Sequence, residues 1–187
     1  MVFQHPFASL NPRMRVGATI AEGPLAHGLV TKAESQADIA RWLADVGLDA
    51  AAARRFQYQF SGGQRQRVAI ARALARRPEA LVCDEPAASL DVSIQAQIIN
   101  LFLKLRRELN LTMLFISHDL SVVRHVSDQV AIMYLGRRVE TGPTEAIFAA
   151  PRHSCTRVLL DSAPRDRREA ACHFPLETRS HEHSQPA

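Results

Sequence analysis

Hydrophobic positions divide most of the chain into helix-like and strand-like stretches. Apolar residues spaced three and four apart predict helices over 16–22 and 35–46, and a longer helix from Asp91 to Leu109. Short apolar runs bounded by turn-forming residues predict buried strands over 80–83 and 112–116. A strand, a helix and a second strand in this order, with a crossover of this length, predict a doubly wound α/β sheet.

Smaller elements are expected on both sides of that centre. Val2 and Phe3 fit the end of a further buried strand, and the alanine-rich stretch over 50–55 is expected to be helical. The later part of the chain is expected to form, in order, a helix over 120–126, a hairpin of 130–135 and 138–140 around Gly136, and a short helix over 144–148.

The stretch from Phe60 to Arg67 is a turn that leads into a helical pattern ending before Pro78. Ser61 can cap this helix through its hydroxyl, and the glycines at 62 and 63 place no side chain between a phosphate and the first-turn N–H groups. The helix dipole adds a positive end at the same point. This chemistry suits an anion site, although a serine cap followed by two flexible glycines is the simpler alternative.

Ionisable side chains follow both predicted strands. Asp84 and Glu85 come directly after the first strand, and His118 comes after the second. Because parallel strands end at one edge of a sheet, these side chains are expected to face the crevice in which such folds bind ligands. Adjacent carboxylates suit phosphoryl transfer, in which one orders a metal ion and the other orients water. The alternatives are a turn with two exposed carboxylates and a histidine with a structural role.

Composition narrows the class of protein. A chain of 187 residues with 47% hydrophobic residues can build the core of one ordinary domain. It has no apolar run of the roughly 18 to 20 residues that a membrane span needs. Its amino terminus also lacks the features of an export signal. The three cysteines, Cys83, Cys155 and Cys172, have no metal-ligand spacing and cannot all pair, which predicts a reducing, cytoplasmic setting.

The net charge of +4 would allow an anionic partner such as nucleic acid or a membrane surface. The arginines are spread over several amphipathic helices, so solvated helix faces are the favoured explanation. We therefore expect no nucleic-acid partner.

Several motifs resemble those of ABC-type ATPases and occur in the order of that family. The matching motifs are the signature at 61–67 with 68–74 after it, the Walker B strand at 81–86, the D-loop at 89–91, the H-loop at 115–120 and the Q-loop at Gln4. This resemblance implies a P-loop NTPase-like α/β fold with a parallel sheet, incomplete in this chain, and a helical subdomain.

The resemblance also implies a division of the chain into parts. The expected parts are the Q-loop and the end of a core strand at 1–12, a helical subdomain with the signature at 13–78, an α/β core at 79–150, an importer-type extension at 151–164 and a disordered tail at 165–187.

Each site residue receives a role from the same resemblance. Glu85 would act as general base, and Asp84 would order Mg²⁺. His118 and Gln4 would sense the γ-phosphate and the attacking water, and Gln4 would also be a metal ligand. In this family two ATPase domains pack head to tail, so the signature of one meets the ATP held by the other. The residues expected to bind ATP in this way are Ser61, Gly62, Gly63, Gln64 and Asp91. ATP and Mg²⁺ are the implied cofactors.

Three further stretches, 7–14, 91–93 and 151–160, are similar to ATPase subunits of the oligopeptide and dipeptide importer group. This implies a subunit that hydrolyses ATP at the cytoplasmic face of the cell membrane and powers the import of peptides or similar small solutes. The implied partners are a second ATPase subunit, two transmembrane permease subunits and, indirectly, a solute-binding protein.

Metal chemistry near the carboxyl terminus is not expected. Some members of the importer group bind an iron-sulfur cluster there, but Cys155 and Cys172 fall short of the usual four ligands. His173, His181 and His183 are expected to be exposed tail residues instead of metal ligands.

The chain departs from the family pattern in one major respect. It contains no Gly-x-x-x-x-Gly-Lys-Ser/Thr sequence, the loop that cradles the β- and γ-phosphates. We therefore expect Met1 to be an internal methionine of a longer domain, and the isolated chain to be poorly stable and unable to bind ATP. The smaller departures are His5 in place of Asp and Ala88-Ser89 in place of Ser-Ala, and both concern coupling more than hydrolysis.

Two alternative functions stay open. The chain could be a non-catalytic fragment that only docks on a partner ATPase or permease. It could instead be an ABC ATPase of nucleic-acid repair or translation, which fits the basic charge but not the importer-like extension.

Overall fold

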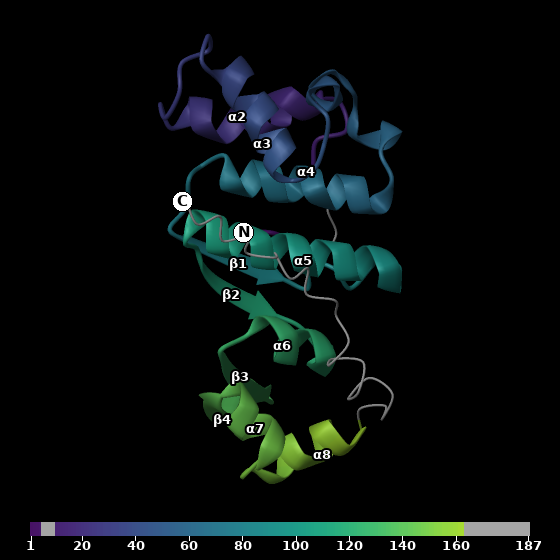
Figure 1. The fold of residues 1–187 in the computed structure, drawn as a ribbon, viewed down its shortest axis with the longest axis vertical. Coiled ribbons are helices and arrows are strands. Elements are labelled where there is room, and N and C mark those ends of the chain that lie inside the picture. The colour runs from purple at the N-terminus through teal and green to yellow at the C-terminus, as the bar shows by residue number, and fades with distance from the viewer. Residues whose placement is uncertain (5–9, 163–187) are drawn as a thin grey trace, which may run out of the picture. The chain divides into compact units, whose positions relative to one another are not determined.

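The computed structural model describes residues 1–4 and 10–162, which fall into two compact units, one from Met1 to His118 and one that begins at Asp119 (Figure 1). The predictions that concern His5 and residues 165–187 lie outside the described residues. The first unit contains, in chain order, α2 (Val16–Ala26), α3 (Ser35–Asp45), the 3₁₀ turns η1 (Ala50–Arg54) and η2 (Gln57–Gln59), α4 (Gly62–Leu74), β1 (Ala80–Asp84), α5 (Val92–Leu109) and β2 (Thr112–Ile116).

A small parallel sheet lies at the centre of the first unit. Strands β1 and β2 pair in parallel from Ala80 opposite Thr112 to Asp84 opposite Ile116. On the other edge of β1, Val2 forms a parallel bridge through two backbone hydrogen bonds, to the Val82 carbonyl at 2.8 Å and from the Asp84 N–H at 2.9 Å. The predicted parallel α/β sheet is therefore confirmed.

One face of this sheet is covered by α5 (Figure 1) and holds much of the core. Leu81 and Cys83 are buried on this face, and the ring of Phe115 meets that of Phe102 of α5 edge-to-face at 5.8 Å. Alternation along a strand puts these three sheet residues on the same side. Burial raises the pKa of the Cys83 thiol to about 12.

The opposite face of the sheet is open. Leu114 is 60% exposed, Ile116 is 45% exposed and Phe3 is 43% exposed. The prediction that 112–116 is a buried strand is therefore wrong for the face that carries Leu114 and Ile116, as is the prediction of a buried Phe3. The physical reason is that α5 covers one side of the sheet only, so alternate residues of β2 remain in contact with solvent.

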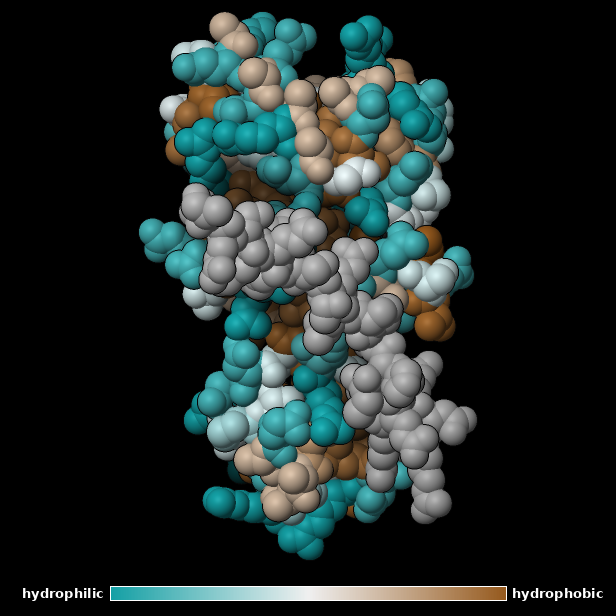
Figure 2. All heavy atoms as spheres, in the orientation of Figure 1, coloured by the Kyte–Doolittle hydropathy of each residue, from teal (hydrophilic) through white to brown (hydrophobic). Residues whose placement is uncertain are grey.

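A helical layer of α2, α3 and α4 forms the other part of the first unit, with α4 next to α5 (Figure 1). Its core includes Ile20, Leu43 and Ile70, which are fully buried, and Trp42, the single tryptophan of the chain. Figure 2 shows hydrophobic residues set back between hydrophilic ones over this layer, as expected of amphipathic helices.

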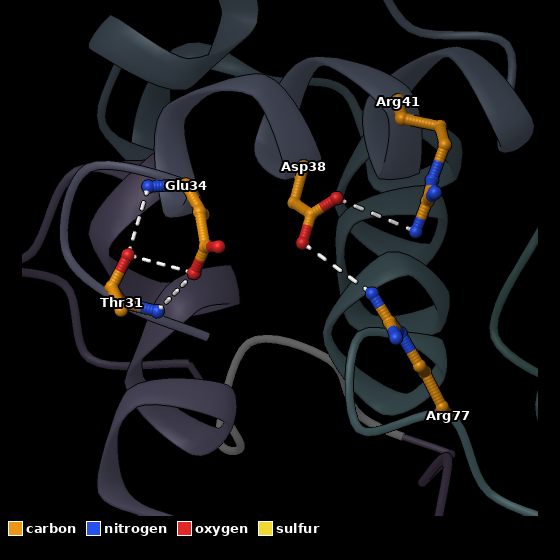
Figure 3. Close-up of polar contacts among 5 residues, drawn as sticks. All are labelled: Thr31, Glu34, Asp38, Arg41 and Arg77. Carbon is orange, nitrogen blue, oxygen red and sulfur yellow. Dashed lines mark hydrogen bonds and ion pairs between the residues drawn. The ribbon is translucent and has the colours of Figure 1, made fainter. Parts of the chain in front are cut away.

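Polar contacts on the surface of this layer help to place α3 (Figure 3). Ahead of α3, the Glu34 carboxylate accepts hydrogen bonds from the N–H and hydroxyl of Thr31 at 2.8 and 2.7 Å. Farther along, Asp38 lies between Arg41 and Arg77, at 3.5 and 3.6 Å. Only the pair with Arg77 joins α3 to the segment after α4, and because both arginine side chains are exposed these ion pairs contribute little to stability.

Several element boundaries differ from those expected. Helix α2 continues past residue 22 to Ala26, with Pro24 inside its last turn. Helix α4 stops at Leu74, because Arg77 takes a positive φ of 49° and donates its N–H to the Leu74 carbonyl. The stretch over 50–55 is a 3₁₀ turn, and the 3₁₀ turn η2 was not expected.

The second unit contains α6 (Leu120–Val126), β3 (Gln129–Tyr134), β4 (Arg137–Pro143), α7 (Thr144–Ala149) and α8 (Ser154–Ser162). Strands β3 and β4 form the expected antiparallel hairpin, and both Leu135 and Gly136 have positive φ at its turn. The strand β4 is longer than the expected 138–140 and runs directly into α7.

A carboxylate connects this hairpin to α8. Glu140 of β4 accepts the backbone N–H groups of Arg152 at 2.8 Å and His153 at 3.1 Å. Among the described residues the buried Thr156 hydroxyl has no hydrogen-bond partner of regular geometry, yet it lies near enough to favour the charged carboxylate. Thr156, together with these N–H groups, holds the pKa of Glu140 below its ordinary value.

None of the helices over residues 1–4 and 10–162 has both the length and the hydropathy required to cross a bilayer.

Candidate functional site

The two predicted catalytic side chains at the sheet edge are in contact. Glu85 follows β1 and His118 follows β2, and the carboxylate Oε1 lies 2.8 Å from the imidazole Nδ1. Parallel strands end at the same edge, which is why residues far apart in the chain meet here. The His118 side chain is 73% exposed and the Glu85 side chain is 24% exposed. The pair is therefore open to a ligand on the histidine side.

The backbone of Glu85 is held in an unusual conformation. Its φ is 44°, in the left-handed region that residues other than glycine seldom adopt. Its N–H donates to the Ile116 carbonyl at 2.9 Å, which ties it to the end of β2. Such strain persists only where surrounding contacts impose it, and it is common at functional sites. Nothing in the residue types around Glu85 indicates this conformation.

Asp84 and Gln4 lie on neighbouring segments at this edge. Asp84 is the last residue of β1, and Gln4 comes two residues after the bridge that Val2 makes to β1. The residues that the structure describes hold no group of three or more His, Cys, Asp or Glu side chains suited to a metal ion. Mg²⁺ usually takes one or two protein oxygens and completes its shell with phosphate oxygens and water. The carboxylate of Asp84 and the amide oxygen of Gln4 fit that limited set.

The turn at Ser61 caps α4 as expected. The Ser61 hydroxyl accepts the Gln64 N–H at 3.3 Å, and the Gln64 side-chain oxygen accepts the Ser61 N–H at 3.1 Å. This reciprocal capping box fixes both side chains. It leaves the first-turn N–H groups of Gly62 and Gly63, which cannot have acceptors within the helix, at the positive end of α4.

The two signature glycines differ in their surroundings. A Cβ at Gly62 would lie 3.3 Å from Leu90, whereas a Cβ at Gly63 would lie only 2.5 Å from the Cγ2 of Ile94. Gly62 is exposed and Gly63 is buried. Sequence reasoning assigned both glycines to phosphate access and missed the packing requirement at Gly63.

The D-loop residues lie between the other motifs. The Ser89 hydroxyl donates to the Gln4 carbonyl at 3.3 Å, and Leu90 approaches Gly62. Asp91 is the N-cap of α5, is exposed, and makes no side-chain capping hydrogen bond. The Asp91 carboxylate is therefore exposed at the start of α5 without a hydrogen bond that caps this helix. The contact from Ser89 had no signal in the sequence beyond the residue type.

Comparison with known proteins finds a matching family. A family profile described as ABC transporter matches residues 1–88. A Brucella abortus protein named for peptide import and ATP binding is 57% identical over 90% of this chain and 51% of its own length. Residues 1–88 therefore match the ABC transporter family, and the chain is similar to ATP-binding proteins of peptide import over about 90% of its length. The expected fold and the resemblance to the peptide importer group are thus confirmed.

Other relatives agree. An oligopeptide transport ATP-binding protein of Bacillus subtilis is 50% identical, over 91% of this chain and 52% of its own length. A dipeptide transport ATP-binding protein of Haemophilus influenzae is 47% identical, over 88% of this chain and 50% of its own length. The chain thus spans about half the length of these curated relatives.

The solved structures lead to the same family. The structure of CbiO1 from Clostridium perfringens, part of an ABC transporter complex, matches with a TM-score of 0.71 and 27% identity. The match covers 90% of this chain and 65% of CbiO1.

Proposed function

We propose that the chain belongs to the ATP-hydrolysing subunit of an ABC importer for peptides or similar small solutes. The observation that carries this proposal is the contact between Glu85 and His118 at the edge of the parallel sheet. Relatives named for peptide, oligopeptide and dipeptide transport support the class of solute. The protein would act from the cytoplasmic face of the cell membrane.

In this proposal Glu85 is the general base. His118 Nδ1–H donates to Oε1, so Oε2 stays available to accept a proton from the attacking water. Nε2, on the other side of the ring from Glu85, would face the γ-phosphate. Asp84 and Gln4 would hold Mg²⁺, which would supply positive charge against the phosphates.

The Ser61 turn serves a second nucleotide in this proposal. Ser61, Gly62, Gly63, Gln64 and the nearby Asp91 would contact ATP held by a second ATPase subunit in a head-to-tail dimer. The capped turn supports this role, because its free first-turn N–H groups and the helix dipole favour an anion. Two permease subunits, and through them a solute-binding protein, would complete the transporter.

The chain's own nucleotide site lacks one component. No phosphate-loop sequence occurs in its 187 residues, so no backbone cradle for the β- and γ-phosphates is available from them. We therefore propose that these residues alone do not bind ATP. Titration of a fluorescent ATP analogue onto the purified chain should give no saturable signal. Micromolar, Mg²⁺-dependent binding would contradict this part of the proposal.

Reconstitution tests the transport role. The chain would be combined with a peptide-importer permease and a partner ATPase that retains its phosphate loop, and ATP turnover would be measured. We expect the chain to stimulate turnover and Ser61→Arg to abolish the stimulation, because the longer, charged side chain fills the phosphate position. Ser154→Arg, on the exposed first turn of α8, is the matched control. Equal stimulation by both variants would exclude a role for the Ser61 turn.

A second candidate function is docking without catalysis, and the absent phosphate loop favours it. The chain would then bind the partner ATPase or the permease without changing turnover. The same reconstitution separates the two functions, because co-purification without stimulation supports docking.

A further inference from the structure

The closest packing contact at the signature turn joins α4 to the first turn of α5. A methyl group added at Gly63 would lie 2.5 Å from the Cγ2 of Ile94, closer than real Cβ atoms approach other atoms. Gly63 is helical and has no positive φ, so its backbone conformation would accept any residue. The need for glycine at this position is therefore steric, and its source is a side chain of this same chain.

Two more contacts join α4 to the D-loop and α5. Leu90 would lie 3.3 Å from a Cβ added at Gly62, and Arg67 Nη2 donates to Gln97 Oε1 at 3.4 Å. Residues 63 and 67 are four apart on α4, and residues 94 and 97 are three apart on α5, so each pair shares one face of its helix. The signature helix thus contacts the D-loop and α5 along its first two turns.

Arg67 also fixes α4 to the end of α3. Its Nη1 donates to the Val46 carbonyl at 2.6 Å, just beyond α3. Gly47, next in the chain, has a φ of 72° and leaves room for the guanidinium, because a Cβ there would lie 3.1 Å from Nη1. The signature turn is therefore held on one side by α5 and on the other by the end of α3.

We propose that Ile94 is a positioning residue that fixes the Ser61 turn against the D-loop, so that the two segments move as one body. Ile94 is the reason why residue 63 carries no side chain, and the Gly63 N–H stays available to the partner's phosphate. The packing contact does not depend on the proposed function, but its consequence rests on that function. If the D-loop and the Ser61 turn move together, a displacement of Asp91 would also displace the turn that faces the partner's nucleotide.

A double-mutant cycle with a matched control tests the contact. Gly63→Ala should lower the Tm of the chain by roughly 2 to 12 °C, because overpacking costs about 1 to 3 kcal/mol. Ile94→Ala removes Cγ2 and should relieve the clash, so the double variant should melt higher than the sum of the single effects. Ile94→Val also shortens the side chain but keeps Cγ2, and should give no relief. Equal losses in both double variants would overturn the proposal.

Turnover in the reconstituted transporter separates positioning from mere stability. Gly63→Ala should abolish the stimulation of ATP turnover. Adding Ile94→Ala to Gly63→Ala should restore the stimulation, whereas adding Ile94→Val should not. Recovery of the Tm without recovery of turnover would overturn the proposal, because the missing side chain at Gly63 would then be required for the approach of a phosphate. If the unaltered chain fails to stimulate turnover, the proposed function fails, and the melting cycle still decides the contact.

Hydrogen exchange supplies a second measurement should Ile94→Ala not fold. In the Gly63→Ala chain, amide exchange should become faster both in the second turn of α4 and in residues 95–98 of α5, whose N–H groups have acceptors within the helices. Faster exchange confined to α4 would overturn the proposal, since the two segments would then open independently.

Discussion

The signature turn and the sheet edge belong to the same unit, but they are held in different ways. The turn at Ser61 is fixed by a capping box and by close packing of a buried glycine on Ile94. The sheet edge carries a largely exposed His118, a Glu85 with positive φ and, on its open face, an exposed Leu114. The first region is packed against other residues of its own chain, whereas the second leaves side chains exposed to solvent.

This difference explains why the two regions are expected to respond differently to substitution. A change at the turn acts through packing, so it should affect stability and function together. A change at the open edge should affect chemistry with little effect on folding, because exposed groups contribute little to stability. Four experiments, in order of decreasing effect, compare closely packed with exposed positions.

Glu85→Gln should have the largest effect. In a full-length domain that supplies these residues with a phosphate loop, so that their own site can bind ATP, we expect turnover to fall about 10² to 10⁴-fold, the usual contribution of a general base, with the Tm of that domain nearly unchanged. Steady-state ATP hydrolysis and thermal melting provide the two measurements. Glu79→Gln, an exposed carboxylate just ahead of β1, is the control. Unchanged turnover would remove Glu85 as the base.

Leu43→Ala and Leu114→Ala compare a closed region with the open face. Leu43 is fully buried, so its truncation should cost about 2 to 5 kcal/mol of unfolding free energy. Leu114 is 60% exposed, and its truncation should change that free energy by no more than about 0.5 kcal/mol. Urea unfolding followed by Trp42 fluorescence measures both. A large loss at Leu114 would mean that this sheet face is packed in the folded chain.

Ser61→Ala should cost about 1 kcal/mol, because the capping hydrogen bond to the Gln64 N–H is lost. The same urea experiment measures it, with Ser93→Ala, on the exposed first turn of α5, as the control. Equal stability of the two variants would show that the cap contributes nothing to the rigidity of the turn.

Glu140→Gln should have the smallest effect at neutral pH and should change the pH dependence of α8. The folded carboxyl has a lowered pKa, so its stabilisation is complete above the ordinary glutamate pKa of about 4.3 and is lost as pH falls through the folded value. The protection of α8 amides, taken relative to the intrinsic exchange rate at each pH, should therefore fall in acid in the unaltered chain and depend less on pH in the variant. Glu108→Gln, at an exposed position of α5, should retain the acid response.

Much of the first unit could be predicted from its sequence. The periodicity of α5 and the bounded apolar run of β2 were sufficient to place both elements, and the rule that parallel strands end at one edge brought Glu85 and His118 together. Element type follows from local pattern, which is why these predictions agree with the structure.

The remaining features depend on contacts between distant segments. The positive φ of Glu85 is imposed by its hydrogen bond to Ile116, and the clearance at Gly63 is set by Ile94. The exposure of Leu114 depends on which helix covers the sheet, and a single strand has the same apolar pattern whether or not its second face is covered. The prediction of roles for the individual site residues stays untested until activity is measured.

The buried Cys83 thiol can report how often the sheet opens. Its thiol has a pKa of about 12 and lies on the face that α5 covers, so a thiol reagent can attack it only after the helix and the sheet separate. With Cys155 and Cys172 replaced by serine, the rate of labelling would measure how often β1 separates from α5. Binding of any partner to the open sheet face would slow that rate without touching the cysteine.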